Sequence, residues 1–260
     1  MNRNIKVAVA QMNSHVGSID YNLRKIIKFI NLGKNKKVDL LCFPELALVG
    51  YPPEDLLLSK NFLKMVELAV KKIQKKDKNI SYIVGYPKLI EGKLYNVAGV
   101  FIHGELKYEY KKIRLPNYGV FDEQRYFKSG IEPLMFKLKN RSIYLTICED
   151  IWDDFMISPD ISKKDSPDLL INLSASPFNI TKQNDRLKLL GNIARKNNIE
   201  VVYSNLVGGQ DELVFDGNSF FLDSEGKMIS KAGEFNEELK VQTLNYKTKY
   251  KKTIFKRKNK

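Results

Sequence analysis

The chain has 260 residues, 43% of them hydrophobic, which is enough to bury one large core and too many for a chain that is disordered throughout. Its net charge is +14, from 44 basic and 30 acidic side chains, and its two cysteines are too few for a disulfide framework, which favours a reducing, cytoplasmic location. We find no N-terminal segment of signal-peptide type and no apolar run of transmembrane length, so we expect no membrane association.

Short apolar runs alternate along the chain with stretches whose apolar residues keep helical spacing. The runs predict strands at Lys6–Gln11, Leu40–Pro44, Ile80–Tyr86, Asn96–Ile102, Ile143–Cys148, Leu169–Leu173 and Val201–Asn205, with hairpin-like strands at Ser219–Leu222 and Met228–Lys231. Helical spacing joins Leu23, Ile26, Ile27 and Ile30, then Phe62, Val66, Ala69, Val70 and Ile73, and later Leu187, Leu190, Ile193 and Ala194. This alternation is typical of an α/β fold, and without a linker-like stretch it indicates one domain over residues 1–246.

The end of the chain, residues 247–260, differs from the rest in charge. It carries eight basic side chains and no acidic one, and the other residues together have a net charge of +6. Such a block of like charges is usually a solvated, partly disordered tail. The alternative is an electrostatic docking strip for an acidic partner or RNA.

Three residues whose side chains can take part in catalysis lie at the ends of strand-like runs: Glu45, Lys112 and Cys148. A thiolate attacks carboxamides well, but it needs a base to take its proton and a fixed positive charge where the oxyanion forms. Taken singly, these residues are equally explained as a helix cap, a surface lysine and a small core residue. Their combination predicts an amide-cleaving site, whereas Cys42 lies within an apolar run and is predicted only to pack.

Aromatic residues, prolines and acids mix in the segments that follow these strand ends. Tyr51, Tyr118 and Phe121 are predicted to help shape a pocket there, because loops on a rigid sheet commonly carry function. Ordinary turn chemistry explains the neighbouring prolines but not this clustering of aromatic rings. Since Glu45 and Lys112 are expected at strand ends and outside the core, their substitution is expected to leave the fold intact.

The residues around these positions resemble the nitrilase superfamily of carbon–nitrogen hydrolases. The resemblance rests on segments 43–57, 110–127, 147–152 and 208–217, which occur in the family's order and extend over nearly the whole chain. Within the superfamily the chain is most similar to the glutamine-amidohydrolase domain of glutamine-dependent NAD synthetases. The resemblance implies a single-domain, four-layer αββα sandwich, with two sheets between helices, that assembles into a homo-oligomer.

The resemblance also implies a role for each matching residue. Glu45 would be the general base, Lys112 the oxyanion-stabilising lysine and Cys148 the nucleophile. Glu123 matches a second active-site glutamate, and the backbone N–H of Glu149 would complete the oxyanion hole. The positions at which the subgroup shapes its glutamine pocket are Tyr51, Tyr118, Phe121 and Ser176.

The match departs from the family pattern at the lysine. Where the family has Tyr-Arg-Lys-x-His-Leu-Pro, this chain has Lys111 in place of the arginine and Arg114 in place of the histidine. We therefore assign the catalytic role to the second basic residue, Lys112. With only His15 and His103 in the chain, we expect neither a zinc site nor a Cys–His pair, and no cofactor. Both histidines are predicted at the surface or in turns.

The predicted function is hydrolysis of glutamine through a γ-glutamyl thioester, with the ammonia supplied to a separate NAD synthetase. We expect a separate partner because we recognise no synthetase phosphate loop in this sequence. Segment 208–211 resembles such a loop only superficially, and no other such loop is found. One alternative is an independent amidase acting on another small amide. A second is a non-catalytic regulator or nucleic-acid-binding protein that uses residues 247–260. The intact set of Glu45, Lys112 and Cys148 argues against this second alternative.

Overall fold

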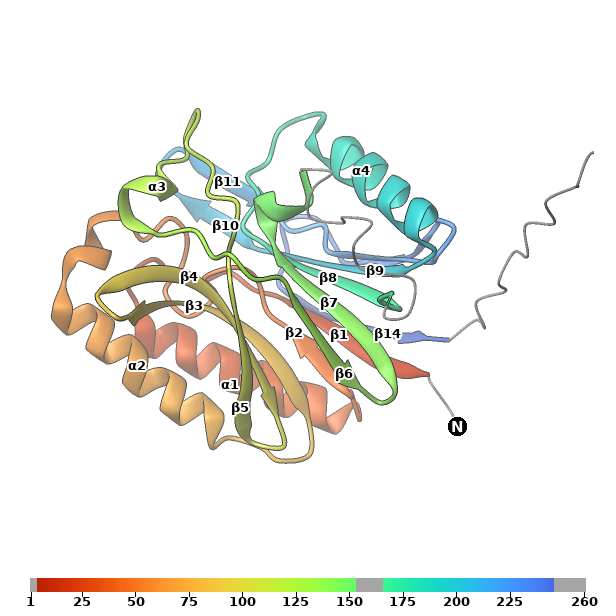
Figure 1. Ribbon diagram of the computed structural model, residues 1–260, viewed down its shortest axis with the longest axis horizontal. Coiled ribbons are helices and arrows are strands. Elements are labelled where there is room, and N and C mark those ends of the chain that lie inside the picture. The colour runs from red at the N-terminus through yellow and green to blue at the C-terminus, as the bar shows by residue number, and fades with distance from the viewer. Residues whose placement is uncertain (1–3, 153–165, 246–260) are drawn as a thin grey trace, which may run out of the picture.

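The computed structural model describes residues 4–152 and 166–245. The domain boundary expected at residue 246 and the basic segment 247–260 lie outside the described residues. Within them, two six-stranded sheets lie face to face, with α1 and α2 on one side and α4 on the other (Figure 1).

The first sheet has the strand order β14-β1-β2-β3-β4-β5. Its strands are β1 (Ile5–Gln11), β2 (Leu40–Cys42), β3 (Ser81–Ile90), β4 (Lys93–Ile102), β5 (Glu105–Lys111) and β14 (Glu238–Leu244). β1, β2 and β3 are parallel, and the outer strands pair antiparallel. β14 comes from the far end of the described chain, yet it pairs along the whole of β1, from Ile5 opposite Leu244 to Gln11 opposite Glu238.

The second sheet has the order β13-β12-β9-β8-β7-β6, with β7, β8 and β9 parallel at its centre. Its strands are β6 (Leu134–Leu138), β7 (Arg141–Ile147), β8 (Leu169–Ser174), β9 (Glu200–Asn205), β12 (Phe220–Leu222) and β13 (Met228–Lys231). A separate hairpin joins β10 (Val207–Gln210) and β11 (Leu213–Asp216).

Three long helices cover the outer faces of the sheets. α1 (Ile19–Asn35) and α2 (Lys60–Gln74) pack on the first sheet, and α4 (Lys182–Asn197) packs on the second. The Ser59 hydroxyl caps α2 by accepting the Phe62 N–H, which satisfies one of the free donors of the first turn. The shorter helices are η1 (Glu54–Leu58), α3 (Glu123–Tyr126) and η2 (Cys148–Trp152).

The two sides of each sheet belong to different cores, because successive residues of a strand point to opposite faces. In β1, Val7 and Val9 face the second sheet, while Ala8 and Ala10 face the helices. The layer between the sheets also holds Cys42, which is fully buried. Helix, sheet, sheet and helix thus form the four-layer αββα sandwich that the sequence predicted.

The predicted strands and helices are confirmed in type, with differences at their ends. β2 stops at Cys42 and not at Pro44, because the chain leaves the sheet there to cross β3. The sequence did not predict five strands, namely β5, β6, β10, β11 and β14. Most of them lie at sheet edges or in the isolated hairpin, where many residues are only partly buried and the apolar pattern is weak.

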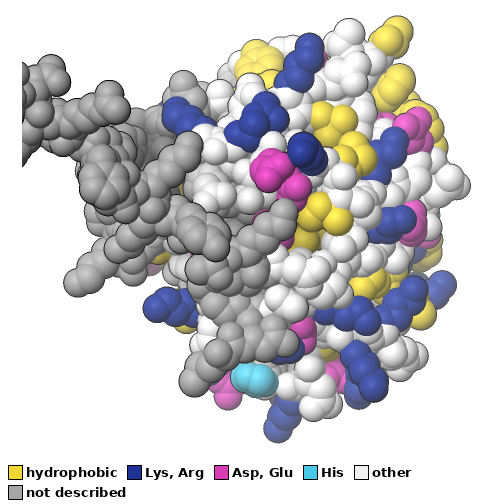
Figure 2. Space-filling model, turned by 90° about the vertical axis from the view of Figure 1, so that its right-hand side faces the viewer, with side chains coloured by type: hydrophobic (Ala, Val, Ile, Leu, Met, Phe, Trp, Pro, Cys, Tyr) yellow, Lys and Arg dark blue, Asp and Glu magenta, His cyan; other side chains and the backbone are white. Residues whose placement is uncertain are grey.

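One face of the molecule shows how the basic residues are distributed there. On the face shown in Figure 2, Lys and Arg side chains of the described residues are scattered among apolar and acidic ones and form no single patch. His15 and His103 are both exposed, His103 in the turn between β4 and β5, as predicted.

Candidate active site

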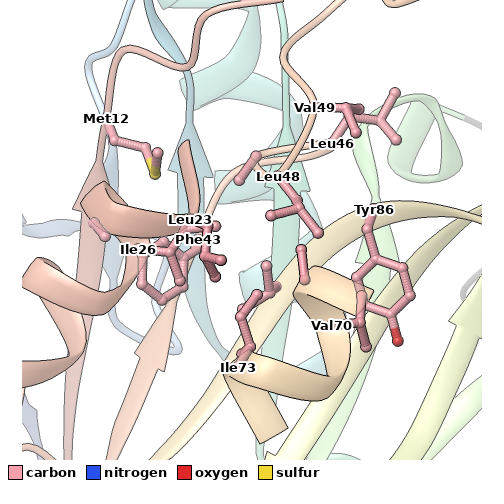
Figure 3. Packing of buried hydrophobic residues seen from close by; sticks show 14 of the residues in the cluster. Met12, Leu23, Ile26, Phe43, Leu46, Leu48, Val49, Val70, Ile73 and Tyr86 are labelled. Carbon is pink, nitrogen blue, oxygen red and sulfur yellow. The ribbon is translucent and has the colours of Figure 1, made fainter. Parts of the chain in front are cut away.

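The loop that follows β2 is held rigidly. Its backbone crosses β3 so closely that a Cβ on Gly85 would lie 2.4 Å from the Leu46 nitrogen, so only glycine fits at this crossing. Leu46 has a positive φ of 48°, and the Leu46, Leu48 and Val49 side chains pack into the core with Phe43 (Figure 3). This packing fixes the backbone on both sides of Glu45.

The Glu45 carboxylate is almost completely buried and has three hydrogen-bond donors. Its Oε1 accepts from Asn96 Nδ2 at 2.8 Å and from Lys112 Nζ at 2.6 Å. Its Oε2 accepts from the Ala175 N–H at 3.0 Å. Since Ala175 follows β8, Glu45 lies where the carboxyl ends of β2 and β8, one strand from each sheet, come together.

Lys112 follows β5 and its ammonium group lies between two carboxylates. Nζ is 2.6 Å from Glu45 Oε1 and 2.7 Å from Glu123 Oε1, and the side chain is fully buried. Burial alone lowers the pKa of this ammonium, but Glu123 and Glu45 outweigh it and hold the pKa well above its usual range. Lys111 instead lies over the Tyr95 ring, so the structure brings Lys112 and not Lys111 to Glu45.

The expectation that Glu45 and Lys112 lie outside the core is wrong. Both follow strands, but at 1% and 0% exposure they are among the most buried polar residues of the chain. Strand position alone did not reveal this, because the loops and the second sheet cover both residues. Removing either one leaves a buried charge unpaired, so their substitution will affect stability as well as chemistry.

Glu123, the first residue of α3, completes the acidic cluster. Its Oε1 accepts from the Tyr51 hydroxyl at 2.8 Å and from Lys112, whereas Oε2 has no hydrogen-bond partner among the described residues. Burial, opposed by Lys112 and assisted by Glu45, raises the pKa of Glu123 to about 7. Glu123 therefore changes charge near neutral pH.

This shift predicts how stability depends on pH. Between the ordinary pKa of 4.5 and about 7, folded Glu123 retains a proton that the unfolded chain has released, so stability falls as pH rises across this window. We expect Glu123→Gln to flatten this part of the slope. Urea unfolding of both proteins from pH 5 to pH 8 checks it. An unchanged slope in the variant would assign the titration to another group.

Cys148 directly follows β7 and starts η2 with a φ of 42°, a left-handed conformation that is strained for a non-glycine residue. Burial raises the pKa of its thiol, and the Glu45 carboxylate raises it further, while Lys112 opposes them. The thiol is thus neutral at rest and needs a base before it can attack. Glu45, Lys112 and Glu123 all lie near enough for their charges to act on it.

The predicted pocket aromatics form a row from the surface to Glu123. Tyr118 meets Phe121 edge to face at 5.6 Å, and Phe121 meets Tyr51 at 6.5 Å. The exposed Tyr118 hydroxyl donates to Glu149 Oε1 at 2.9 Å. Both residues line a cleft of about 750 Å³, which is large enough for an amino acid. The other described residues that line it are Ile113, Arg114, Leu115, Pro116, Asn117, Gln124, Ser129 and Trp152.

Ser176 does not line this cleft in the part of the chain that the structure describes. Its hydroxyl accepts from Arg186 Nε at 3.2 Å, and its carbonyl accepts from Arg186 Nη2 at 2.8 Å. Arg186 Nη1 also donates to both carboxylate oxygens of the buried Asp216, at 2.9 Å each. The Arg186–Asp216 pair therefore fixes the loop whose Ala175 N–H bonds to Glu45.

Replacing Arg186 should destabilise the protein strongly. Arg186→Met leaves the Asp216 carboxylate buried without its charged partner, which we expect to cost about 3–5 kcal/mol in the free energy of unfolding. Arg195→Met, at an exposed position on the same helix, should change it by less than about 0.5 kcal/mol. Urea unfolding of the two variants measures the difference, and equal effects would mean that the pair adds nothing.

Sequence reasoning missed the residues that hold this site together. Asn96, Asp150, Arg186 and Asp216 are polar and at most 1% exposed. Only Asp150 could have been linked to the site from the local sequence, because it lies two residues after Cys148. The others lie on remote segments and become visible only when the chain is folded.

Within 4–152 and 166–245, no three His, Cys, Asp or Glu side chains gather as they would around a metal ion. Over the same ranges no helix combines the length and apolarity needed to cross a membrane.

The chain combines a four-layer αββα sandwich with a buried Glu–Lys–Glu cluster near a strained cysteine, and residues 6–250 match the carbon–nitrogen hydrolase family. The chain belongs to that family. It is 41% identical over 239 residues to the glutamine-dependent NAD(+) synthetase of Thermotoga maritima, covering 91% of this chain and 41% of that protein. The synthetase of Aquifex aeolicus is also 41% identical, over 93% of this chain and 42% of that protein. The chain thus spans less than half of these relatives' length.

Solved structures agree with the fold. A glutamine-dependent NAD+ synthetase from Acinetobacter baumannii superimposes with a TM-score of 0.89 at 37% identity, covering 93% of this chain and 46% of that one. An amidase from Nesterenkonia sp. superimposes with a TM-score of 0.83 at 23% identity, covering 94% and 91% of the two chains. At that identity the amidase supports the fold alone.

Proposed function

We propose that this protein hydrolyses the side-chain amide of glutamine, with Cys148 as nucleophile, Glu45 as general base and Lys112 as oxyanion-stabilising group. The observation that carries the proposal is the fully buried Lys112 ammonium, held 2.6 Å from Glu45 in the cluster whose charges act on the Cys148 thiol. A base and a fixed positive charge at a thiol are what amide cleavage requires.

In the first half of the reaction, Glu45 takes the thiol proton as the Cys148 sulfur attacks the amide carbon. Because burial raises the pKa of the thiol, proton removal must accompany the attack. Lys112 and the backbone N–H of Glu149 stabilise the negative oxygen that develops. Glu45 then gives its proton to the departing nitrogen, and ammonia leaves a γ-glutamyl thioester on Cys148.

In the second half, Glu45 takes a proton from water as the water oxygen attacks the thioester carbon. The same donors stabilise the second oxyanion, and the carbon–sulfur bond breaks to release glutamate. Glu45 returns its proton to the Cys148 sulfur. Glu123 keeps the Lys112 ammonium in place through Oε1, and the Tyr51 hydroxyl donates to the same oxygen and so helps to fix Glu123.

The cleft beside the site suits an amino acid. We assign Tyr118 and Glu149 to its walls, with the Glu149 carboxylate available for a cationic amino group, and Phe121 to a supporting position against the Tyr118 ring. Tyr51 and Ser176 are assigned to substrate binding by the family pattern, and their hydrogen bonds to Glu123 and Arg186 give both a supporting role as well.

Ammonia release from glutamine tests the proposal against the independent amidase. Purified protein is offered glutamine, asparagine, acetamide and propionamide, and ammonia is measured with each. Preference for glutamine by roughly a hundredfold or more in kcat/KM supports the proposal, since a site built for a charged substrate discriminates against analogues that lack its polar groups. Faster turnover of the aliphatic amides supports the amidase.

We further propose that the ammonia serves an ammonia-dependent NAD synthetase, which the names of the relatives and their additional length support. Adding such a synthetase with ATP and the acid dinucleotide should raise glutamine turnover. If segment 247–260 helps docking, its removal or added salt should reduce the gain. Turnover that is unaffected by the synthetase would favour an enzyme that works alone.

A further inference from the structure

The two proposed oxyanion donors come from chain segments far apart in sequence. Lys112 follows β5 of the first sheet, and the Glu149 N–H lies in the turn after β7 of the second. An oxyanion hole works only when its donors hold their relative positions to about 0.5 Å. A contact must therefore hold the segment around Lys112 in a fixed position relative to the turn that contains Cys148 and Glu149.

The Asp150 carboxylate contacts both segments. Its Oδ1 accepts the backbone N–H groups of Ile113 at 3.2 Å and Arg114 at 2.8 Å, directly after Lys112. Its Oδ2 accepts the Ile147 N–H at 2.8 Å, which closes the turn containing Cys148 and Glu149. The Tyr110 hydroxyl donates to the same oxygen at 2.7 Å.

Asp150 is fully buried, so water cannot replace these bonds. A neutral amide cannot replace the carboxylate either, because one of its two ends donates hydrogen bonds and does not accept them. Depending on its orientation, the NH₂ group of the amide would then face either the backbone N–H groups of Ile113 and Arg114 or the backbone N–H of Ile147. The Asp150 carboxylate is therefore suited to joining the segment after Lys112 to the turn that contains Cys148.

We propose that Asp150 is a positioning residue that holds Lys112 and the Glu149 N–H in register as one oxyanion hole. The proposal rests on the proposed function in its assignment of those donors, but it does not depend on which amide is the substrate. Asp150 itself touches no reacting atom in this scheme.

Two chemical probes of Cys148 isolate this role. Acylation by p-nitrophenyl acetate forms a bond from sulfur to the ester carbon through an oxyanion and expels p-nitrophenolate. Alkylation by iodoacetamide forms a sulfur–carbon bond and expels iodide with no oxyanion. Glu45 takes the thiol proton in both reactions, so only acylation depends on the oxyanion donors.

We expect Asp150→Asn to slow acylation by about tenfold or more and alkylation by less than about threefold, the first figure lying below the loss of a whole oxyanion donor. Asp168→Asn is the matched control. Asp168 is also a buried aspartate that accepts a backbone N–H, from Ser142 at 2.9 Å, but its carboxylate bonds between β7 and the start of β8. This control should leave the ratio of the two rates unchanged.

Tyr110→Phe removes one of the four bonds and provides a milder test if Asp150→Asn fails to fold. Like Asp150→Asn, it should slow acylation more than alkylation. Equal slowing of both reactions, or the same selectivity in Asp168→Asn, would overturn the role of Asp150. A wild-type protein that is acylated but does not hydrolyse glutamine would contradict the proposed substrate and leave Asp150 in place. Alkylation without acylation in the wild type would overturn the oxyanion assignment and Asp150 with it.

Discussion

Replacing Cys148 by alanine is expected to abolish amide turnover, with a loss of about a thousandfold or more, since no other group can form the thioester. Only Cys148 among the two cysteines stands next to the buried Glu45–Lys112 pair, and its turn has the strained backbone that often marks a reacting residue. Ammonia release under saturating substrate measures the loss.

Cys42→Ala is the matched control for this substitution. Cys42 is buried like Cys148, but it packs between the two sheets among apolar residues. We expect the control to retain turnover within a few-fold and to lose about 1 kcal/mol of stability to the small cavity. Diazo-oxo-norleucine should label Cys148 and spare Cys42, as mass spectrometry of peptides would show. Turnover that survives Cys148→Ala would reject the nucleophile.

Replacing Lys112 by methionine is expected to have two large effects at once. Turnover should fall by about a hundredfold or more because the oxyanion loses its fixed positive charge. Stability should fall by about 3–5 kcal/mol because Glu45 and Glu123 remain buried without their shared cation. Initial rates and urea unfolding measure the two effects separately.

Two variants separate the effects. Lys112→Met combined with Glu123→Gln removes one of the stranded charges, so it should recover part of the stability and none of the turnover. Lys111→Met alters the adjacent lysine, whose ammonium lies over Tyr95, and should preserve turnover within about threefold. Loss of turnover in Lys111→Met with normal activity in Lys112→Met would mean that the lysine assignment is shifted by one residue.

The central strands and the α/β class could be predicted because buried strands and amphipathic helices leave strong patterns in the sequence, whereas the four-layer sandwich was predicted from the family resemblance. Ile143, Leu145 and Ile147 alternate so regularly that the strand preceding Cys148 was clear. The same pattern could not reveal β14, whose residues Glu238–Leu244 are mostly half-exposed and mix charged with apolar side chains.

The candidate site was foreseen as separate residues and not as a network. Glu45, Lys112, Glu123 and Cys148 could be named from local segments and a family pattern. The depth of their burial depends on loops from both sheets, which no local window contains. The support from Asn96 and Ala175 to Glu45 is likewise a product of the fold, because these partners are 51 and 130 residues away.

The pairing of β14 with β1 sets a condition on synthesis of the chain. Until residues 238–244 leave the ribosome, β1 has one edge whose backbone donors and acceptors lack their strand partner. β1 is nearly all buried in the finished fold, so a nascent or truncated chain would present an apolar strand open to pairing with other chains. Truncation before residue 238 should therefore yield insoluble protein and not a smaller active enzyme.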